Sequence, residues 1–144
     1  MRIGPVIVIA LALSIAIVPQ FTDCLSQGRQ LTLANGSNVP MKCHWTAVAE
    51  LGMSLPLFAT GLVLAASRRK EGARTLGLVT AALGVAVLLL PVTLIGVCSN
   101  PDMICHSVMR PFLVLAGTLT LLYGLGTMAV SAPSKGEAER VGLA

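Results

Sequence analysis

The stretch that decides the fold is TLGLVTAALGVAVLLLPVTLIGV, residues Thr75 to Val97, which contains no charged side chain. A helix needs about 20 such residues to cross the roughly 30 Å of hydrocarbon in a bilayer. Strands of a membrane β-barrel alternate apolar and polar side chains, and runs such as VAVLLLPVTLIGV do not alternate. This stretch therefore predicts a transmembrane helix.

Three further stretches have the same character: Ile3 to Phe21, Trp45 to Ser67 and Pro111 to Ala132. The whole chain of 144 residues is 55% hydrophobic and only 11% charged, with a mean hydropathy of +0.84, whereas soluble proteins carry about a quarter charged residues. We therefore predict an all-α integral membrane four-helix bundle over residues 1–132, built of two transmembrane hairpins. Its helices cover about 3–21, 45–67, 75–97 and 111–132, its outer loops are 22–44 and 98–110, and residues 133–144 form a disordered cytoplasmic tail.

The first stretch follows Arg2 and also fits a cleaved signal peptide, but VPQFTDC contains no small-x-small cleavage triplet. We expect it to remain as the first helix.

The orientation follows from the basic residues, because cytoplasmic loops carry an excess of Lys and Arg. Three of the 10 basic residues, Arg29, Lys42 and Arg110, fall on the side of the outer loops. The other seven fall on the opposite side: Arg2, Arg68, Arg69, Lys70, Arg74, Lys135 and Arg140. Both termini are thus expected in the cytoplasm, with the outer loops on the extracytoplasmic face of the plasma (inner) membrane. The net charge of +4 then indicates a lipid bilayer as partner and requires no nucleic acid.

Each outer loop carries two cysteines at helix ends: Cys24 and Cys43 in the first, Cys98 and Cys105 in the second. An even number of cysteines in an oxidising compartment indicates disulfide bonds. Three pairings are open. The simplest joins the cysteines within each loop, and closing the longer loop stabilises the fold by about 3 kcal/mol in the chain-entropy model.

Both loops also end in Met-x-Cys-His, at Met41 to His44 and at Met103 to His106. Thioether, thiolate and imidazole together form a soft ligand set that suits copper(I), or an axial pair for haem. A copper or haem site is therefore an alternative to a purely structural role, and its candidate ligands are Met41, Cys43, His44, Met103, Cys105 and His106.

A third hypothesis is a thiol-relay enzyme, because four helices with a cysteine pair in each outer loop are also the arrangement of quinone-linked disulfide oxidases. Their reactive cysteine usually belongs to Cys-x-x-Cys, which this sequence lacks. The sequence thus favours a protein that is not an enzyme and has no cofactor.

Glu50 is an ionisable residue about two turns inside the second helix, and such residues often have a function. We expect it to form an ion pair with Arg110 at the outer start of the fourth helix, whose long side chain can reach downward. Such a pair would either fix two helices against each other or serve a proton or substrate.

Small residues at four-residue spacing allow close helix packing. They occur at Gly77 and Ala81, at Ala82 and Ala86, and along the last helix at Ala116, Thr120 and Gly124. These positions indicate packing faces of a compact bundle, and they also suit contacts with other transmembrane helices, in a second copy or in a larger permease. Trp45 is the expected anchor at the membrane interface.

The motifs MKCHWTAVAELG (41–52) and LIGVCSNPDMIC (94–105) resemble a family of prokaryotic membrane proteins known as domain of unknown function 4418. The family pattern falls on Cys24, on Met41 to Trp45, on Leu94 to Cys98 and on Met103 to Cys105, and His106 is not assigned to it. The resemblance implies an association with ABC-type export permeases of the macrolide-exporter kind. We therefore expect a non-enzymatic accessory, or small subunit, of a membrane transport system.

Overall fold

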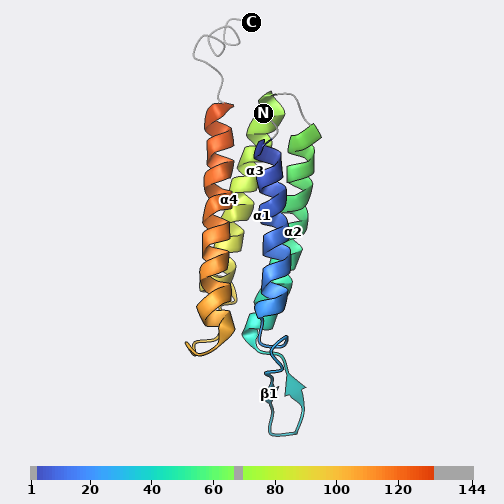
Figure 1. Ribbon diagram of the computed structural model, residues 1–144, viewed down its shortest axis with the longest axis vertical. Helices are drawn as coiled ribbons and strands as arrows, with labels where there is room; N and C mark the ends of the chain where they lie inside the picture. Colours follow the sequence, from blue (N-terminus) through green and yellow to red (C-terminus); the bar gives the residue numbers. More distant parts are fainter. Residues whose placement is uncertain (1–2, 67–69, 132–144) are drawn as a thin grey trace, which may run out of the picture.

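The computed structural model describes residues 3–66 and 70–131. Four long helices lie side by side and nearly parallel to one axis (Figure 1). They are α1 (Ile3–Thr22), α2 (Lys42–Ala66), α3 (Lys70–Leu89) and α4 (Arg110–Val130). Helix α1 packs mainly on α2, and α3 mainly on α4, with fewer contacts between α2 and α3. The predicted pair of hairpins is thus present.

The helices of the described chain are long and apolar enough to span a membrane four times. Large apolar side chains are exposed on all four helices, for example Val6, Leu55, Leu78 and Leu122. Exposed apolar side chains of this density are costly in water and favourable in lipid. The fold is therefore the expected all-α four-helix arrangement of a multi-pass membrane protein.

Irregular helix turns extend the second hairpin at the loop end. The π-helical turn η1 (Leu90–Leu94) continues α3, and η2 (Cys105–Met109) leads into α4. Pro91 lies at the start of η1, where its missing N–H is best accommodated by a changed hydrogen-bond pattern. Gly96 ends this segment with φ +78°, a backbone conformation that costs glycine little.

The long loop between α1 and α2 contains a small antiparallel hairpin that projects beyond the helix ends (Figure 1). Strand β1 (Leu31–Thr32) pairs with β2 (Asn38–Val39), with Leu31 opposite Val39. Gly36 supplies the positive φ of +81° that the turn requires.

Glycines allow α3 and α4 to pack backbone to backbone. A Cβ atom on Gly84 would lie 3.0 Å from the carbonyl oxygen of Gly117, and one on Gly117 would lie 3.0 Å from the backbone nitrogen of Leu88. Gly77 and Gly124 meet in the same way two turns further along. The small residues of α3 and α4 thus form the contact between these two helices of the same chain. Ala82, which we expected on a packing face, is exposed.

Two boundaries differ from expectation. Helix α2 begins at Lys42 rather than near residue 45, and helical structure before α4 begins at Cys105 rather than at 111. Both loop-closing cysteines are thus the first or second residue of a helical segment. The expected disordered tail, 133–144, lies outside the described residues, as do the side chains of Arg2, Arg68, Arg69 and Lys70.

Candidate functional site

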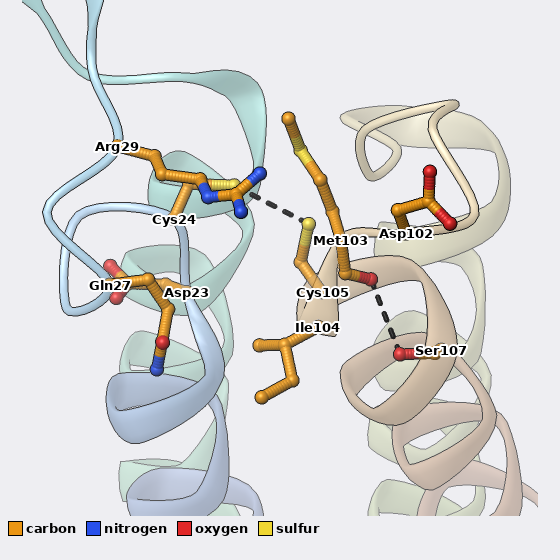
Figure 2. A pocket seen from close by; sticks show the side chains of 9 residues that line it. All are labelled: Asp23, Cys24, Gln27, Arg29, Asp102, Met103, Ile104, Cys105 and Ser107. Atoms are coloured by element: carbon orange, nitrogen blue, oxygen red, sulfur yellow. Dashed lines mark hydrogen bonds between the residues drawn. The ribbon is translucent and has the colours of Figure 1, made fainter.

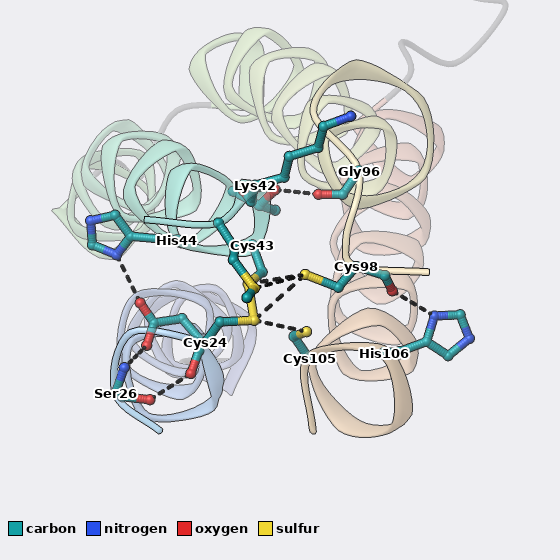
Figure 3. The surroundings of a disulfide bond; sticks show 12 residues. Cys24, Ser26, Lys42, Cys43, His44, Gly96, Cys98, Cys105 and His106 are labelled. Carbon is teal, nitrogen blue, oxygen red and sulfur yellow. Dashed lines mark hydrogen bonds and ion pairs between the residues drawn. A yellow bond between two sulfur atoms is a disulfide. The ribbon is translucent and has the colours of Figure 1, made fainter. Parts of the chain in front are cut away.

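All four cysteines meet at the loop end of the bundle (Figure 3). Their Sγ atoms lie within 4.8 Å of one another. Cys24, Cys43 and Cys105 are buried, and Cys98 is partly buried. We call this group the four-cysteine cluster.

One of the two expected disulfides is present. Cys24 and Cys43 form a disulfide that closes the first outer loop, with their Cα atoms 6.3 Å apart. The expected bond between Cys98 and Cys105 is absent, because both are free thiols.

The free thiols are instead in contact with the disulfide. The Cys105 sulfur lies 3.4 Å from the Cys24 sulfur, and the Cys98 sulfur lies 3.6 Å from both Cys24 and Cys43. Met41 contributes its thioether at the edge of the cluster, 4.0 Å from the Cys98 sulfur.

The helix ends place these sulfurs. Cys43 lies in the first turn of α2, Cys105 begins η2, and Cys24 follows the end of α1. The hydroxyl of Thr46 donates to the carbonyl oxygen of Gly96 at 2.7 Å, which joins α2 to the segment that carries Cys98. The cluster is therefore built from both hairpins.

The two histidines point away from the sulfur atoms (Figure 3). The His44 Nδ1 atom lies 2.8 Å from a carboxylate oxygen of Asp23, and His106 donates from Nδ1 to the carbonyl oxygen of Cys98 at 3.1 Å. The expected Met-Cys-His ligand set is therefore not gathered around one point. The two cysteines of these motifs lie in the four-cysteine cluster. The imidazole of His44 contacts Asp23, and that of His106 contacts the backbone at Cys98.

Asp23 is almost fully buried, at 3% exposure. Burial by itself raises the pKa of its carboxyl group, but the hydrogen bonds from His44 and Ser26 together outweigh burial and lower that pKa below its ordinary value of 3.8. One of these bonds comes from the backbone N–H of Ser26 at 2.7 Å. A lowered pKa in the folded state stabilises the fold above about pH 4, and this stabilisation is lost as the pH falls further.

We therefore expect Asp23→Asn to release the first loop. Hydrogen bonds to charged groups contribute about 1.5–3 kcal/mol, so thermal unfolding in detergent micelles should occur at a lower temperature at pH 7. As the pH falls below about 4, the wild type should approach the variant. The control is Asp102→Asn, which changes an exposed carboxylate in the second loop. Equal midpoints for wild type and Asp23→Asn at pH 7 would contradict the prediction.

The expected ion pair between Glu50 and Arg110 is absent. Glu50 is completely buried, and neither of its carboxylate oxygens has a hydrogen-bond partner. Arg110 instead lines a cavity of about 230 Å³ with Cys98 and His106. Among the described residues, the carboxyl group of Glu50 therefore has no ionic or hydrogen-bonding partner.

A second cavity, of about 200 Å³, reaches the four-cysteine cluster at Cys24 and Cys105 (Figure 2). Arg29, Asp102 and Met103 also line it. The two cavities thus reach different cysteines of the cluster, and one arginine lines each.

Trp45 lies next to this site at the start of α2 and is 57% exposed. Its ring meets that of His44 edge to face, with centroids 5.9 Å apart. Its role as an interface anchor remains a prediction.

The fold and the site together define a small four-helix membrane protein with a cysteine cluster at one end. The chain belongs to the family described as domain of unknown function (DUF4418), whose model matches residues 6–130. The resemblance found in the two cysteine motifs is thereby confirmed. Neither the curated proteins nor the solved structures contain a match to this chain.

Proposed function

We propose that the protein is a membrane thiol–disulfide exchange protein whose working part is the four-cysteine cluster. The observation that carries this proposal is the contact of two free thiols with one disulfide, at 3.4 Å and 3.6 Å. The sequence argued against an enzyme because it lacks Cys-x-x-Cys. Folding supplies in space the neighbouring cysteines that such a motif supplies along the chain.

Disulfide exchange proceeds by attack of a thiolate on a disulfide sulfur. The Cys105 thiol loses its proton, and its sulfur attacks Cys24. The bond from Cys24 to Cys105 forms, the bond from Cys24 to Cys43 breaks, and Cys43 leaves as a thiolate that takes up a proton. Attack by Cys98 on Cys105 then yields the second loop's disulfide and frees Cys24. No external oxidant is consumed, since one disulfide replaces another.

A partner thiol enters this sequence most directly through the cavity lined by Cys24 and Cys105 (Figure 2). The same exchange chemistry then transfers the disulfide to a protein dithiol outside the membrane.

The test maps the disulfide of the purified full chain in its partly reduced form, which has one disulfide and two free thiols. No reductant is added, the free thiols are blocked by acidic alkylation, and the disulfides are mapped by mass spectrometry. Exchange predicts that the single disulfide is spread over several pairs, including Cys24–Cys105 and Cys98–Cys105. A disulfide with only a structural role predicts Cys24–Cys43 alone, and that result would refute the proposal.

A matched pair of variants sharpens the test. We expect Cys43→Ser to carry a disulfide between Cys24 and Cys105, because these sulfurs are already in contact. Cys98→Ser, the matched variant, keeps only the first step, so its disulfide should be shared between Cys24–Cys43 and Cys24–Cys105. Recovery of Cys43→Ser with Cys24 as a free thiol would show that Cys105 cannot reach it.

The proposed location is the plasma membrane, with the cluster on the extracytoplasmic side, where disulfides persist. The distribution of basic residues along the sequence supports this orientation. An impermeant maleimide applied to intact cells should label Ser37→Cys in the outer loop. Labelling only after lysis would show that the loop faces the cytoplasm and would contradict the proposed orientation.

An accessory role beside an ABC-type export permease is the second candidate. It is supported by the small share of each membrane-spanning segment that is buried within the chain, between 22% and 39%, which leaves most of the helix surface free for lipid or other helices. A photo-crosslinker at Leu55, exposed on α2, should capture a permease subunit. Crosslinks to lipid alone would argue against this role, and crosslinks to a second copy would indicate self-association.

A further inference from the structure

The sulfur atoms of the four-cysteine cluster are spaced like the ligands of a tetrahedral metal site. In such a site the bond from zinc to sulfur is about 2.3 Å, which sets neighbouring sulfurs about 3.8 Å apart. The three contacts across the cluster are 3.4 Å, 3.6 Å and 3.6 Å. These three pairs therefore need to move by only a few tenths of an ångström. The Cys24–Cys43 disulfide must open, and the remaining pairs lie within 4.8 Å.

The peptide segments that carry the cysteines are already held in place. The backbone N–H of Arg29 donates to the carbonyl oxygen of Cys24 at 2.9 Å, and His106 donates to that of Cys98 at 3.1 Å. Mutation of a group that holds a metal ligand in place typically lowers metal affinity 10- to 100-fold. His106 thus has a positioning role beside the cysteines, rather than the ligand role that the sequence suggested.

Access also fits a metal ion, and one side of the site carries a compensating charge. Four thiolates around a divalent ion leave a net charge of −2, and Arg110 lines the cavity on the side of Cys98. Arg29 lines the cavity on the side of Cys24 and Cys105, where Asp23 and Asp102 offset its charge. Each cavity offers an ion a path to the sulfurs.

We propose that the reduced protein binds one thiophilic d¹⁰ metal ion through Cys24, Cys43, Cys98 and Cys105, with Zn²⁺ as the ion that the tetrahedral set fits best. Four thiolates in a closed tetrahedron are typical of zinc. The proposal uses the same cluster as the exchange chemistry but not the exchange itself.

Binding requires reduction first. A dithiol outside the membrane supplies two electrons and two protons to the Cys24–Cys43 disulfide and becomes a disulfide itself. The ion then displaces the protons of four thiols. The disulfide form and the metal form are thus alternative states of one site, and the redox state selects between them.

The test uses the full chain in detergent under anaerobic conditions, reduced with a phosphine that is then removed. Titration with Co²⁺ should give the ligand-field bands of tetrahedral tetrathiolate cobalt, saturating at one ion per chain, and Zn²⁺ should displace it. X-ray absorption of the Zn²⁺ form should show a shell of sulfur at about 2.3 Å and no nitrogen. An imidazole in that shell, or no binding by the reduced chain, would overturn the proposal.

Variants and controls locate the site. Cys98→Ser should weaken Zn²⁺ binding at least about 10-fold, comparable to the smallest loss seen for supporting residues alone. His106→Gln should weaken it while leaving an all-sulfur shell, which distinguishes positioning from ligation. Unreduced protein offers only the two free thiols of Cys98 and Cys105, and fully alkylated protein offers none. Metal binding by either with a shell of four sulfurs would also contradict the proposal.

The outcomes separate this inference from the proposed function. If the reduced protein binds no metal, the exchange proposal still stands, because it is tested by the distribution of disulfides in partly reduced protein. If that protein has a single fixed disulfide, the metal proposal still stands, because it is tested on the fully reduced protein.

Discussion

Replacing Gly124 with leucine is expected to force α4 away from α3 and to destabilise the second hairpin severely. A Cβ atom at this position would clash with the backbone nitrogen of Ala81 and lie 2.7 Å from the carbonyl oxygen of Gly77. Backbone atoms cannot rotate away as a side chain can. We therefore expect a loss of about 3 kcal/mol or more, at the upper end of overpacking effects.

Gly126 is the matched control, because it lies on the same helix and a Cβ atom there meets no atom within 4 Å. Gly126→Leu should be neutral or more stable by about 0.5–1 kcal/mol, since glycine is a poor helix former. Unfolding by denaturing detergent, followed by circular dichroism, measures both variants. Similar stabilities for the two would show that α3 and α4 do not pack through these glycines.

Replacing Glu50 with leucine is expected to stabilise the protein. The carboxyl group is completely buried and has no hydrogen-bond partner, and an unsatisfied buried polar group costs about 1–3 kcal/mol. Leucine has a comparable size and no polar atoms, so the free energy of unfolding should rise by a similar amount. The same detergent titration measures it.

Glu50→Ala separates polarity from volume. Alanine also removes the carboxyl group but leaves a cavity, which costs about 2 kcal/mol or more for a side chain of this size. This variant should therefore be clearly less stable than Glu50→Leu. If Glu50→Leu were less stable than the wild type, the carboxyl group would have a partner in the membrane, and a role in proton or ion binding would follow.

The helices were predictable because their signal is local. Membrane spans follow from length and hydropathy, and the stretch from Thr75 to Val97 shows both. The helix starts were harder to predict, because Lys42 and His106 are polar and hydropathy marks only the apolar part of a span, whereas both residues lie inside helical segments. Hydropathy also does not report tertiary contacts near a helix start, such as the hydrogen bond from Thr46 to Gly96.

The site was only partly predictable. Sequence position placed all four cysteines at one end, but it could not show that Cys98 lies against a disulfide of the other loop. The directions of two side chains were also predicted wrongly. His44 contacts Asp23, and Arg110 lines a cavity with Cys98 and His106 instead of pairing with Glu50. These are choices among nearby partners that spacing along the chain does not determine. The pairing of Gly84 with Gly117 was missed because the spacing considered was four residues, whereas the contacting glycines recur at seven.

The position of the four-cysteine cluster at the junction of the two hairpins has a mechanical consequence. One hairpin contributes Cys24 and Cys43, and the other contributes Cys98 and Cys105. Bonds made within each pair leave the halves joined at this end by noncovalent contacts alone, such as the hydrogen bond from Thr46 to Gly96. A bond made across the pairs, or one ion bound by all four sulfurs, would link the halves covalently or through the metal at the loop end. The supply of electrons to the cysteines would then control how stiff this protein is within the bilayer.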